Sequence, residues 1–220
     1  MGKKSSSEKL VIAAASAGAA VGAAYLAVGN AIFNKTMSKK SIAKKMDEKK
    51  NEYDGITKEG MEWFDSASPA KVKIVTPRGG YVHGEIILAD EPSDVWVIVI
   101  HGYTGSPRRM GSFGKKFHEM GYNCLFPYLC GHGASESNYA TMGWNDRIDI
   151  KAWIDYIINE NASAKIVLFG LSMGAATVMM TTGEPLESNV VCAIEDCGYT
   201  SVWDECRANM KDAYGLPAFP

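Results

Sequence analysis

The residues best suited to chemistry in this sequence are a serine and its small neighbours, Gly170-Leu171-Ser172-Met173-Gly174. An apolar run at 165–169 precedes the motif, and small and apolar residues at 175–182 follow it. These flanks predict a strand, a tight turn and a helix, an arrangement that projects a serine hydroxyl away from the strand end. The two glycines keep bulky side chains out of the turn. The motif therefore predicts a nucleophilic Ser172, with an ordinary glycine-rich turn as the alternative.

A second glycine-rich motif, His101-Gly102-Tyr103-Thr104-Gly105, follows an apolar, β-branched run at 95–100. When a serine attacks a carbonyl group, the negative charge that develops on oxygen needs preorganised N–H donors. We expect the backbone N–H groups of Tyr103 and Met173 to be these donors. Gly102 would let the loop approach the serine closely, and His101 is expected to be structural. A plain turn after a core strand is again the alternative.

The elements that must position these motifs alternate along the chain. Two β-rich runs at 71–76 and 81–88, joined by Pro77-Arg78-Gly79-Gly80, predict a β-hairpin. This order of elements predicts an α/β fold with a doubly wound, mostly parallel sheet and an N-terminal hairpin. Sites in such sheets form at the carboxyl ends of the strands, where both motifs lie. Further strands are predicted at 95–100, 123–127, 165–169 and 190–194, with helices at 110–120, 145–158, 175–182 and 203–214.

With these motifs in place, the sequence resembles the α/β-hydrolase superfamily over about residues 55–220, in its serine aminopeptidase-like and acyl-transfer-related branch. It looks like the membrane-anchored or secreted bacterial hydrolases of unassigned substrate in that branch. The family often has Asp-x-Arg before Gly-His-Gly, whereas Tyr128 and Cys130 stand at those positions here. Besides the two motifs above, the resemblance is carried by Glu62-Trp63-Phe64, Gly131-His132-Gly133, Thr141-Met142-Gly143-Trp144 and Glu195-Asp196-Cys197-Gly198-Tyr199.

The resemblance also implies which partners the serine needs. Such proteins place the acid and then the histidine after the serine, following the seventh and eighth strands. All four histidines here, at positions 83, 101, 118 and 132, precede Ser172, so none is expected to be the base, and His132 is expected to fix its loop. We expect a hydrolase fold that is incomplete at the C terminus, with the last two strands missing. Asp196 is a reserve candidate for the acid, and capping of its loop is the alternative role.

The first residues of the chain predict a membrane helix. Residues 10–34 carry no charge and lie between Lys9 and Lys35. This length matches the roughly 20 residues that span a bilayer core, which favours a single-pass anchor within 1–37. A secretory signal, and hence a secreted protein, is the alternative, because a lysine-containing start precedes the apolar run. Lysines flank both ends, so the side of the membrane on which the domain lies stays open.

The rest of the chain divides into a charged linker-helix region at 38–68 and a hydrolase-like domain at 69–220. Hydrophobic residues make up 46% of the 220 residues, enough for a substantial core. A formal net charge of −2 gives no reason to expect nucleic acid as a partner. The five cysteines lack metal-ligand spacing and are expected to be buried and free. The sequence has no dinucleotide fingerprint or phosphate loop, so we expect no cofactor and no metal.

These observations leave three hypotheses about function. The first is a serine hydrolase of esters, amides or peptides that forms an acyl-enzyme on Ser172, conditional on the acid and histidine that the sequence is expected to lack. The second is a catalytically inactive, membrane-tethered, hydrolase-like module that binds a small molecule or a partner. The third is a truncated product without function. The sequence specifies neither the substrate nor the oligomeric state.

Overall fold

Six strands form one sheet in the computed structural model, which describes residues 5–48 and 54–214. The strand order is β1-β2-β4-β3-β5-β6. The pairs β1–β2 and β2–β4 are antiparallel, and the pairs β4–β3, β3–β5 and β5–β6 are parallel. This arrangement confirms the predicted doubly wound, mostly parallel sheet with its N-terminal hairpin. The strands are β1 (Ala70–Val75), β2 (Tyr81–Ile87), β3 (Val95–Ile100), β4 (Asn123–Pro127), β5 (Lys165–Leu171) and β6 (Val190–Asp196).

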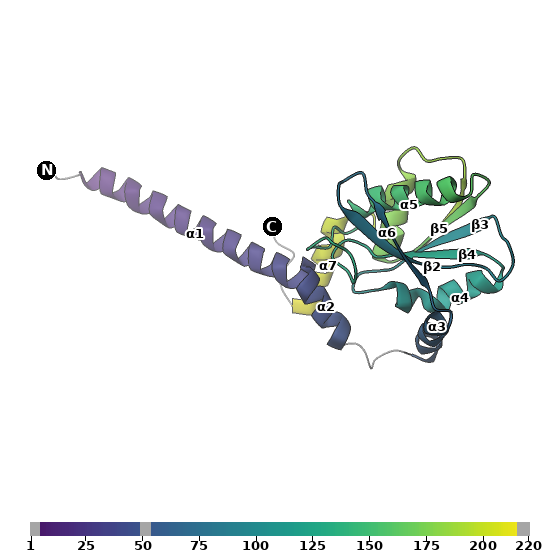
Figure 1. Ribbon diagram of the computed structural model, residues 1–220. Helices are drawn as coiled ribbons and strands as arrows, with labels where there is room; N and C mark the ends of the chain where they lie inside the picture. Colours follow the sequence, from purple (N-terminus) through teal and green to yellow (C-terminus); the bar gives the residue numbers. More distant parts are fainter. Residues whose placement is uncertain (1–4, 49–53, 215–220) are drawn as a thin grey trace.

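Helices cover both faces of this sheet (Figure 1). Side chains alternate along β3, so that Val97 and Val99 enter one core cluster while Ile98 and Ile100 enter the other. The helices that cover the first face are α3 (Gly55–Ser66), the 3-10 turn η1 (Pro107–Met110) and α4 (Gly111–Glu119). On the second face lie α5 (Asp146–Glu160) and α6 (Met173–Thr182), and α7 (Val202–Tyr214) follows β6. Burial on both faces explains why the central strands are continuous apolar runs.

The N-terminal helix α1 (Ser6–Met37) extends away from this body (Figure 1). A capping box formed by Ser5 and Glu8 begins it, which satisfies two backbone N–H groups at the helix start. Its segment Ala15–Met37 is long and apolar enough to cross a membrane and is not buried inside the molecule. The predicted N-terminal hydrophobic helix is therefore present.

Helix α2 (Lys39–Glu48) lies within the charged region at 38–68 and packs against the body. Its side chain Ile42 is completely buried. Helix α3, from the same region, contributes Phe64 to the core. A few apolar residues in a lysine-rich stretch are enough to dock a short helix on neighbouring loops, and charge composition alone does not show this.

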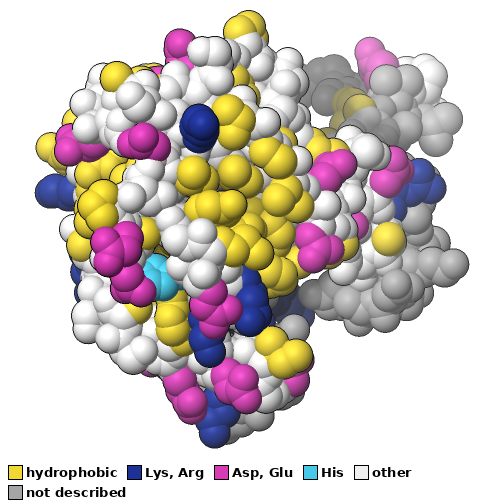
Figure 2. Space-filling view, turned by 90° about the vertical axis from the view of Figure 1, so that its right-hand side faces the viewer, with side chains coloured by type: hydrophobic (Ala, Val, Ile, Leu, Met, Phe, Trp, Pro, Cys, Tyr) yellow, Lys and Arg dark blue, Asp and Glu magenta, His cyan; other side chains and the backbone are white. Residues whose placement is uncertain are grey.

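The sheet ends at β6, whose residues are largely exposed in the described part of the chain. Figure 2 shows hydrophobic side chains gathered on the face seen from the right-hand side of Figure 1. Exposed hydrophobic residues of this part of the chain include Val191 and Ile194 of β6 and Trp203 of α7. The position of β6 also corrects one expectation. Only Cys124 and Cys130 are buried, whereas the three later cysteines are exposed or half-buried, because β6 and α7 carry no covering layer here.

A close contact between α3 and α4 gives a test of this packing. A Cβ atom added at Gly60 would lie 2.2 Å from the backbone nitrogen of Ser112, whereas one at Gly55 in the same helix would meet nothing within 4 Å. We expect Gly60→Ala to lower the free energy of unfolding by about 1–3 kcal/mol because the two helices must separate. Gly55→Ala should be neutral or slightly stabilising. Chemical denaturation compares the two variants, and equal stabilities would contradict this close packing.

Candidate active site

Ser172 stands at the junction of β5 and α6, at the carboxyl end of the parallel strands. Its backbone angles are φ 54° and ψ −113°, a conformation that residues other than glycine rarely adopt. The N–H of Ser172 donates to the carbonyl oxygen of Asp196 on β6 at 2.8 Å, which holds the turn against the neighbouring strand. The residue as a whole is half-buried. A strained serine on a strand-to-helix turn is the geometry that the sequence motif predicts.

The two glycines of the motif are required by close backbone contacts. A Cβ atom at Gly170 would lie 2.3 Å from the carbonyl carbon of Gly174. A Cβ atom at Gly174 would lie 2.2 Å from the carbonyl oxygen of Ile100, the last residue of β3. Any larger residue would push α6 away from the ends of β5 and β3. These contacts explain the spacing of the motif and bring the serine beside the loop that follows β3.

That loop places the second motif next to the serine. A Cβ atom at Gly102 would lie 3.3 Å from Ser172 Cβ and 3.8 Å from Ser172 Oγ. A hydrogen bond of 2.9 Å from the N–H of Gly105 to the carbonyl of Gly102 closes the turn around Tyr103. No described residue accepts a hydrogen bond from the backbone N–H of Tyr103 or from that of Met173. Two unengaged N–H groups on the two turns that meet at Ser172 are what an oxyanion hole needs.

His101 and His132 lie behind this loop, fully buried and with both ring nitrogens engaged by backbone groups. In His101, Nδ1 contacts the carbonyl of Gly102 at 2.8 Å, and Nε2 accepts from the N–H of Leu129 at 3.2 Å. In His132, Nε2 accepts from the N–H of Thr104 at 3.1 Å, and Nδ1 contacts the carbonyl of Cys130 at 2.9 Å. Their Nε2 lone pairs are occupied, so neither ring is placed to take a proton from Ser172.

Burial also keeps both rings uncharged. Desolvation, reinforced by the neighbouring His132, lowers the pKa of His101 from 6.5 to about 3. Burial lowers the pKa of His132 as well. A neutral imidazole with a proton on Nδ1 is the form that both sets of contacts require. Through these contacts the two histidines hold the loops after β3 and β4 against each other.

Asp196 lies at the end of β6, paired in register with Leu171 directly before the serine. Its contact with Ser172 is made by the backbone carbonyl, and its side chain is exposed. The next residue, Cys197, has a positive φ of 52°, so the chain turns sharply there. The structure thus brings Asp196 beside the serine without orienting its carboxylate toward a described histidine.

This geometry agrees with similarities to known proteins. The family model for serine aminopeptidases of the S33 group matches residues 91–194, which hold both motifs. The structure of the Pyrococcus furiosus esterase Pf2001 is 27% identical with a TM-score of 0.60, over 72% of this chain and 60% of that one. The chain belongs to the α/β-hydrolase superfamily.

More distant relatives show the extent of the likeness. The structure of the hydrolase GrgF from Penicillium shares the fold, with 18% identity and a TM-score of 0.52, over 67% of this chain and 53% of that one. An uncharacterized Bacillus subtilis protein, YqkD, is 25% identical over 178 residues, which are 78% of this chain and 58% of YqkD. This α/β-hydrolase chain therefore spans about three fifths of the length of the first relatives it matches.

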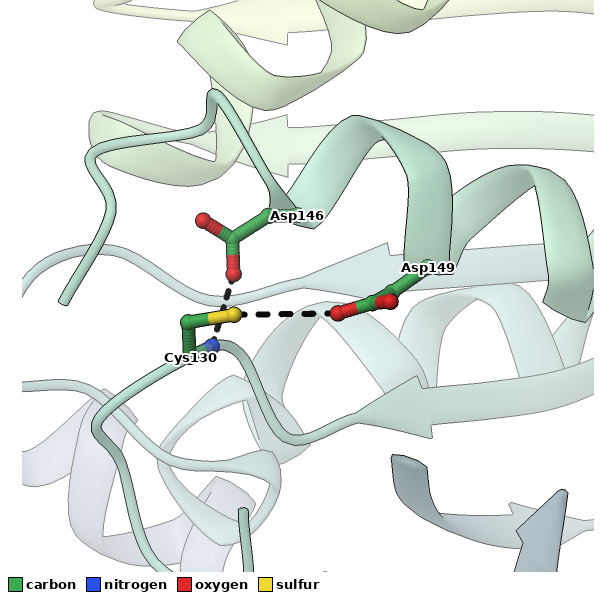
Figure 3. Close-up of side chains that lie close together, drawn as sticks. All are labelled: Cys130, Asp146 and Asp149. Carbon is green, nitrogen blue, oxygen red and sulfur yellow. Dashed lines mark hydrogen bonds between the residues drawn. The ribbon is translucent and has the colours of Figure 1, made fainter. Parts of the chain in front are cut away.

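A buried polar cluster anchors the loop after β4 in this α/β-hydrolase. Cys130, Asp146 and Asp149 place potential metal-ligand atoms within 4.8 Å of one another (Figure 3). The carboxylate of Asp149 accepts from Arg78 Nη2 at 2.6 Å and from Thr76 Oγ1 at 2.6 Å. Burial raises the pKa of the Cys130 thiol to about 12, so it stays protonated. The guanidinium of Arg78 pairs with Asp149, and the carboxylate of Asp146 accepts from the N–H groups of Cys130 and Gly143 and from the hydroxyl of Thr141. Both carboxylates are therefore already engaged by protein donors.

Sequence reasoning did not find this cluster. Cys130 and Tyr128 stand where the family often has Arg and Asp, and the structure shows what replaces them. Arg78 reaches in from the β1–β2 hairpin, and Asp146 accepts from the N–H of Cys130 at 2.7 Å. The Tyr128 hydroxyl donates to Glu85 on β2. The only signal in the sequence is the arginine in the hairpin turn, and nothing in its spacing indicates a partner 71 residues away.

The strain at Ser172 predicts an unusual stability ranking. Ser172→Gly relieves the positive φ, whereas Ser172→Ala keeps it, so we expect the glycine variant to be more stable by about 1 kcal/mol. The same pair of substitutions at Ser163, whose φ is not positive, should show alanine as the more stable residue. Denaturant titration of the four variants checks this. A glycine variant no more stable than alanine at position 172 would show that the elbow is relaxed.

Buried neutral histidines predict a loss of stability in acid. The pKa of His101 is about 3 in the folded protein, below its ordinary value of 6.5, so the unfolded chain binds a proton that the folded chain does not. Between these two values the free energy of unfolding should therefore fall as the pH falls, by up to about 1.4 kcal/mol per pH unit for this group.

Two measurements check this pH dependence. Nitrogen NMR shifts should show His101 as a neutral Nδ1–H ring at pH 5, and denaturation at pH 7.5 and pH 5 should show a shallower loss for His101→Gln than for the unaltered chain. Titration of the folded His101 ring between pH 6 and 7 would contradict the buried, neutral state.

Proposed function

We propose that this chain carries the nucleophile and the oxyanion hole of a serine hydrolase that cleaves ester, amide or peptide bonds through an acyl-enzyme on Ser172. The observation that supports it most is the strained serine that faces Gly102, between two turns whose Tyr103 and Met173 N–H groups have no described acceptor. The family match and the likeness to an esterase favour the same reaction class.

The proposed reaction follows from these positions. Ser172 Oγ attacks the substrate carbonyl while a base removes the hydroxyl proton, and the carbonyl oxygen becomes an oxyanion. The N–H groups of Met173 and Tyr103 donate to that oxygen. The tetrahedral intermediate then expels the alcohol or amine, which takes up the proton, and leaves an acyl ester on Ser172. Attack by water releases the acid and restores the serine.

The proposal needs a base that the described histidines do not supply. His101 and His132 are committed to backbone contacts, and His118 contacts the carbonyl of Leu88 near the amino ends of the parallel strands. We propose Asp196 only as a reserve acid, since its carboxylate is exposed and beside the serine turn. The occupied histidines favour one alternative, a hydrolase-like module that binds a carbonyl or carboxylate ligand at the same N–H groups without turnover.

We further propose that α1 anchors the domain in a membrane as a single-pass helix. Its apolar segment of 23 residues would be about 35 Å long, close to the roughly 30 Å of a bilayer core. A secretory signal passes the same test of length and composition, so a secreted domain remains the alternative. The proposed division is an anchor at 1–37, a charged helical region at 38–68 and a hydrolase domain at 69–220.

A fluorophosphonate probe tests the function, because it phosphonylates an activated serine and leaves other hydroxyls intact. We expect the full chain, extracted in detergent, to be labelled slowly at Ser172, because no described histidine activates the hydroxyl, and Ser172→Ala to lose all labelling. Ser163→Ala, at an exposed serine before β5, should be labelled like the unaltered protein. Peptide mass spectrometry locates the adduct. A folded chain that stays unlabelled while it binds a carboxylate ligand would favour the binding module instead.

A further inference from the structure

The end of α1 and the start of α2 are joined to the loop that follows β4. The N–H of Ala140 donates to the carbonyl of Met37 at 2.8 Å, and the N–H of Lys39 donates to the carbonyl of Asn138 at 2.8 Å. These two bonds form an antiparallel bridge between Ser38 and Tyr139. A bridge of this kind fixes the direction of the N-terminal segment, which a flexible tether would not do.

Side chains extend this contact on both sides of the bridge. The rings of Phe33 and Tyr139 lie with centroids 5.2 Å apart, and the Tyr139 hydroxyl is 3.2 Å from Asn34 Oδ1. Ile42 is completely buried, and the ammonium of Lys39 donates to the carbonyl of Ser135. Residues 33–45, which we term the docking segment, are thus held by backbone, aromatic, apolar and charged contacts together.

The docking segment also holds the loop after β3, through the side chain of Tyr103. The Tyr103 hydroxyl donates to the carbonyl of Thr36, in the last turn of α1. It accepts from Lys45 Nζ at 3.2 Å, and the same ammonium lies 5.3 Å from the centre of the Tyr103 ring. Both hydrogen-bonding roles of the phenol are therefore filled by one segment.

Lys45 differs in this respect from its neighbour on α2. Lys44 is exposed and lies 3.8 Å from Glu48, one turn further along the helix. Lys45 is half-buried, and its recorded contacts in the described chain are with Tyr103. Both lysines belong to α2 and carry the same charge, but only Lys45 contacts the loop that bears the proposed oxyanion donor. Lys44 is therefore a matched control for Lys45.

We infer that the docking segment is a positioning element of the active site, in which Thr36 and Lys45 hold Tyr103 so that its backbone N–H stays aimed at the oxyanion. The inference rests on the proposed function. His132 completes the link, because its Nε2 accepts from the N–H of Thr104 and its ring lies 6.1 Å from that of Tyr103. The backbone of Tyr103 is thereby held in two ways, through its side-chain hydroxyl and through the next residue, Thr104.

The size of the effect follows from the geometry that catalysis demands. A displacement of about 1 Å in a positioned group can lower a rate by up to about 100-fold. Releasing the phenol keeps the N–H of Tyr103 but lets its loop move, so a smaller loss of about 10-fold in kcat is expected. Substrate binding in the ground state depends little on the oxyanion donor, so KM should stay within about twofold.

The test compares Lys45→Met, Lys45→Arg, Lys44→Met and Tyr103→Phe in the full chain in detergent micelles. Hydrolysis of p-nitrophenyl butyrate gives kcat and KM, and the rate of fluorophosphonate labelling reports the reactivity of Ser172. Amide hydrogen exchange of residues 102–105 reports the order of the loop. We expect Lys45→Met and Tyr103→Phe to lose about 10-fold in kcat and to exchange faster. Lys45→Arg should retain most of the rate, and Lys44→Met should match the unaltered chain.

The outcomes separate the inference from the proposed function. An unaltered chain that neither hydrolyses the ester nor reacts with the probe overturns the proposed function. A reactive chain whose kcat and exchange are unchanged by Lys45→Met overturns the positioning role. Equal losses in Lys45→Met and Lys44→Met also overturn it, because they would show a general effect of charge on α2. Faster exchange at residues 102–105 without loss of kcat would show that the segment docks but does not position the donor.

Discussion

The whole arrangement depends on how closely α6 approaches the ends of β3 and β5. The carbonyl oxygen of Ile100 lies where a side chain at Gly174 would begin, so the helix start can touch the strand end only through glycine. That contact forces Ser172 into its positive-φ conformation and brings Gly102 to the serine. Strain of this kind persists only when its surroundings are rigid. Around this turn, the buried histidines, the polar cluster of Cys130, Asp146 and Asp149, and the docking segment hold the neighbouring loops in place.

Much of the fold can be predicted from local patterns. Continuous β-branched runs such as 95–100 mark strands buried on both faces, and the motif around Ser172 marks a strand, a turn and a helix in a fixed order. Observed strand bounds differ from the expected ones by two residues or fewer, as in β5, which extends to Leu171. The same local signals give the two turns that meet at the serine. They succeed because each depends on residues adjacent in the chain.

Contacts between distant residues could not be predicted in this way. Arg78 binds Asp149 and Lys45 contacts Tyr103 across 71 and 58 residues, and the chain between them carries no spacing rule that joins them. The burial of Ile42 is hard to predict for a related reason, since the few apolar residues of this short, lysine-rich helix do not form a long stripe. Residue type alone predicts that the cysteines are buried. Cys192, Cys197 and Cys206 are exposed or half-buried because they lie on or after the edge strand β6.

The loop after β3 depends both on local turn residues and on contacts with residues that are distant in the sequence. Its sequence explains the turn, because Gly102 and Gly105 allow it, but turn chemistry does not fix where Tyr103 points. The direction comes from His132 on one side and from Thr36 and Lys45 on the other. A proposed donor held from the docking segment and from the loop after β4 has few ways to relax, which is the condition for electrostatic stabilisation without reorganisation. The segment that joins the apolar helix to the domain therefore forms, through its contacts with Tyr103, part of the surroundings of the candidate site.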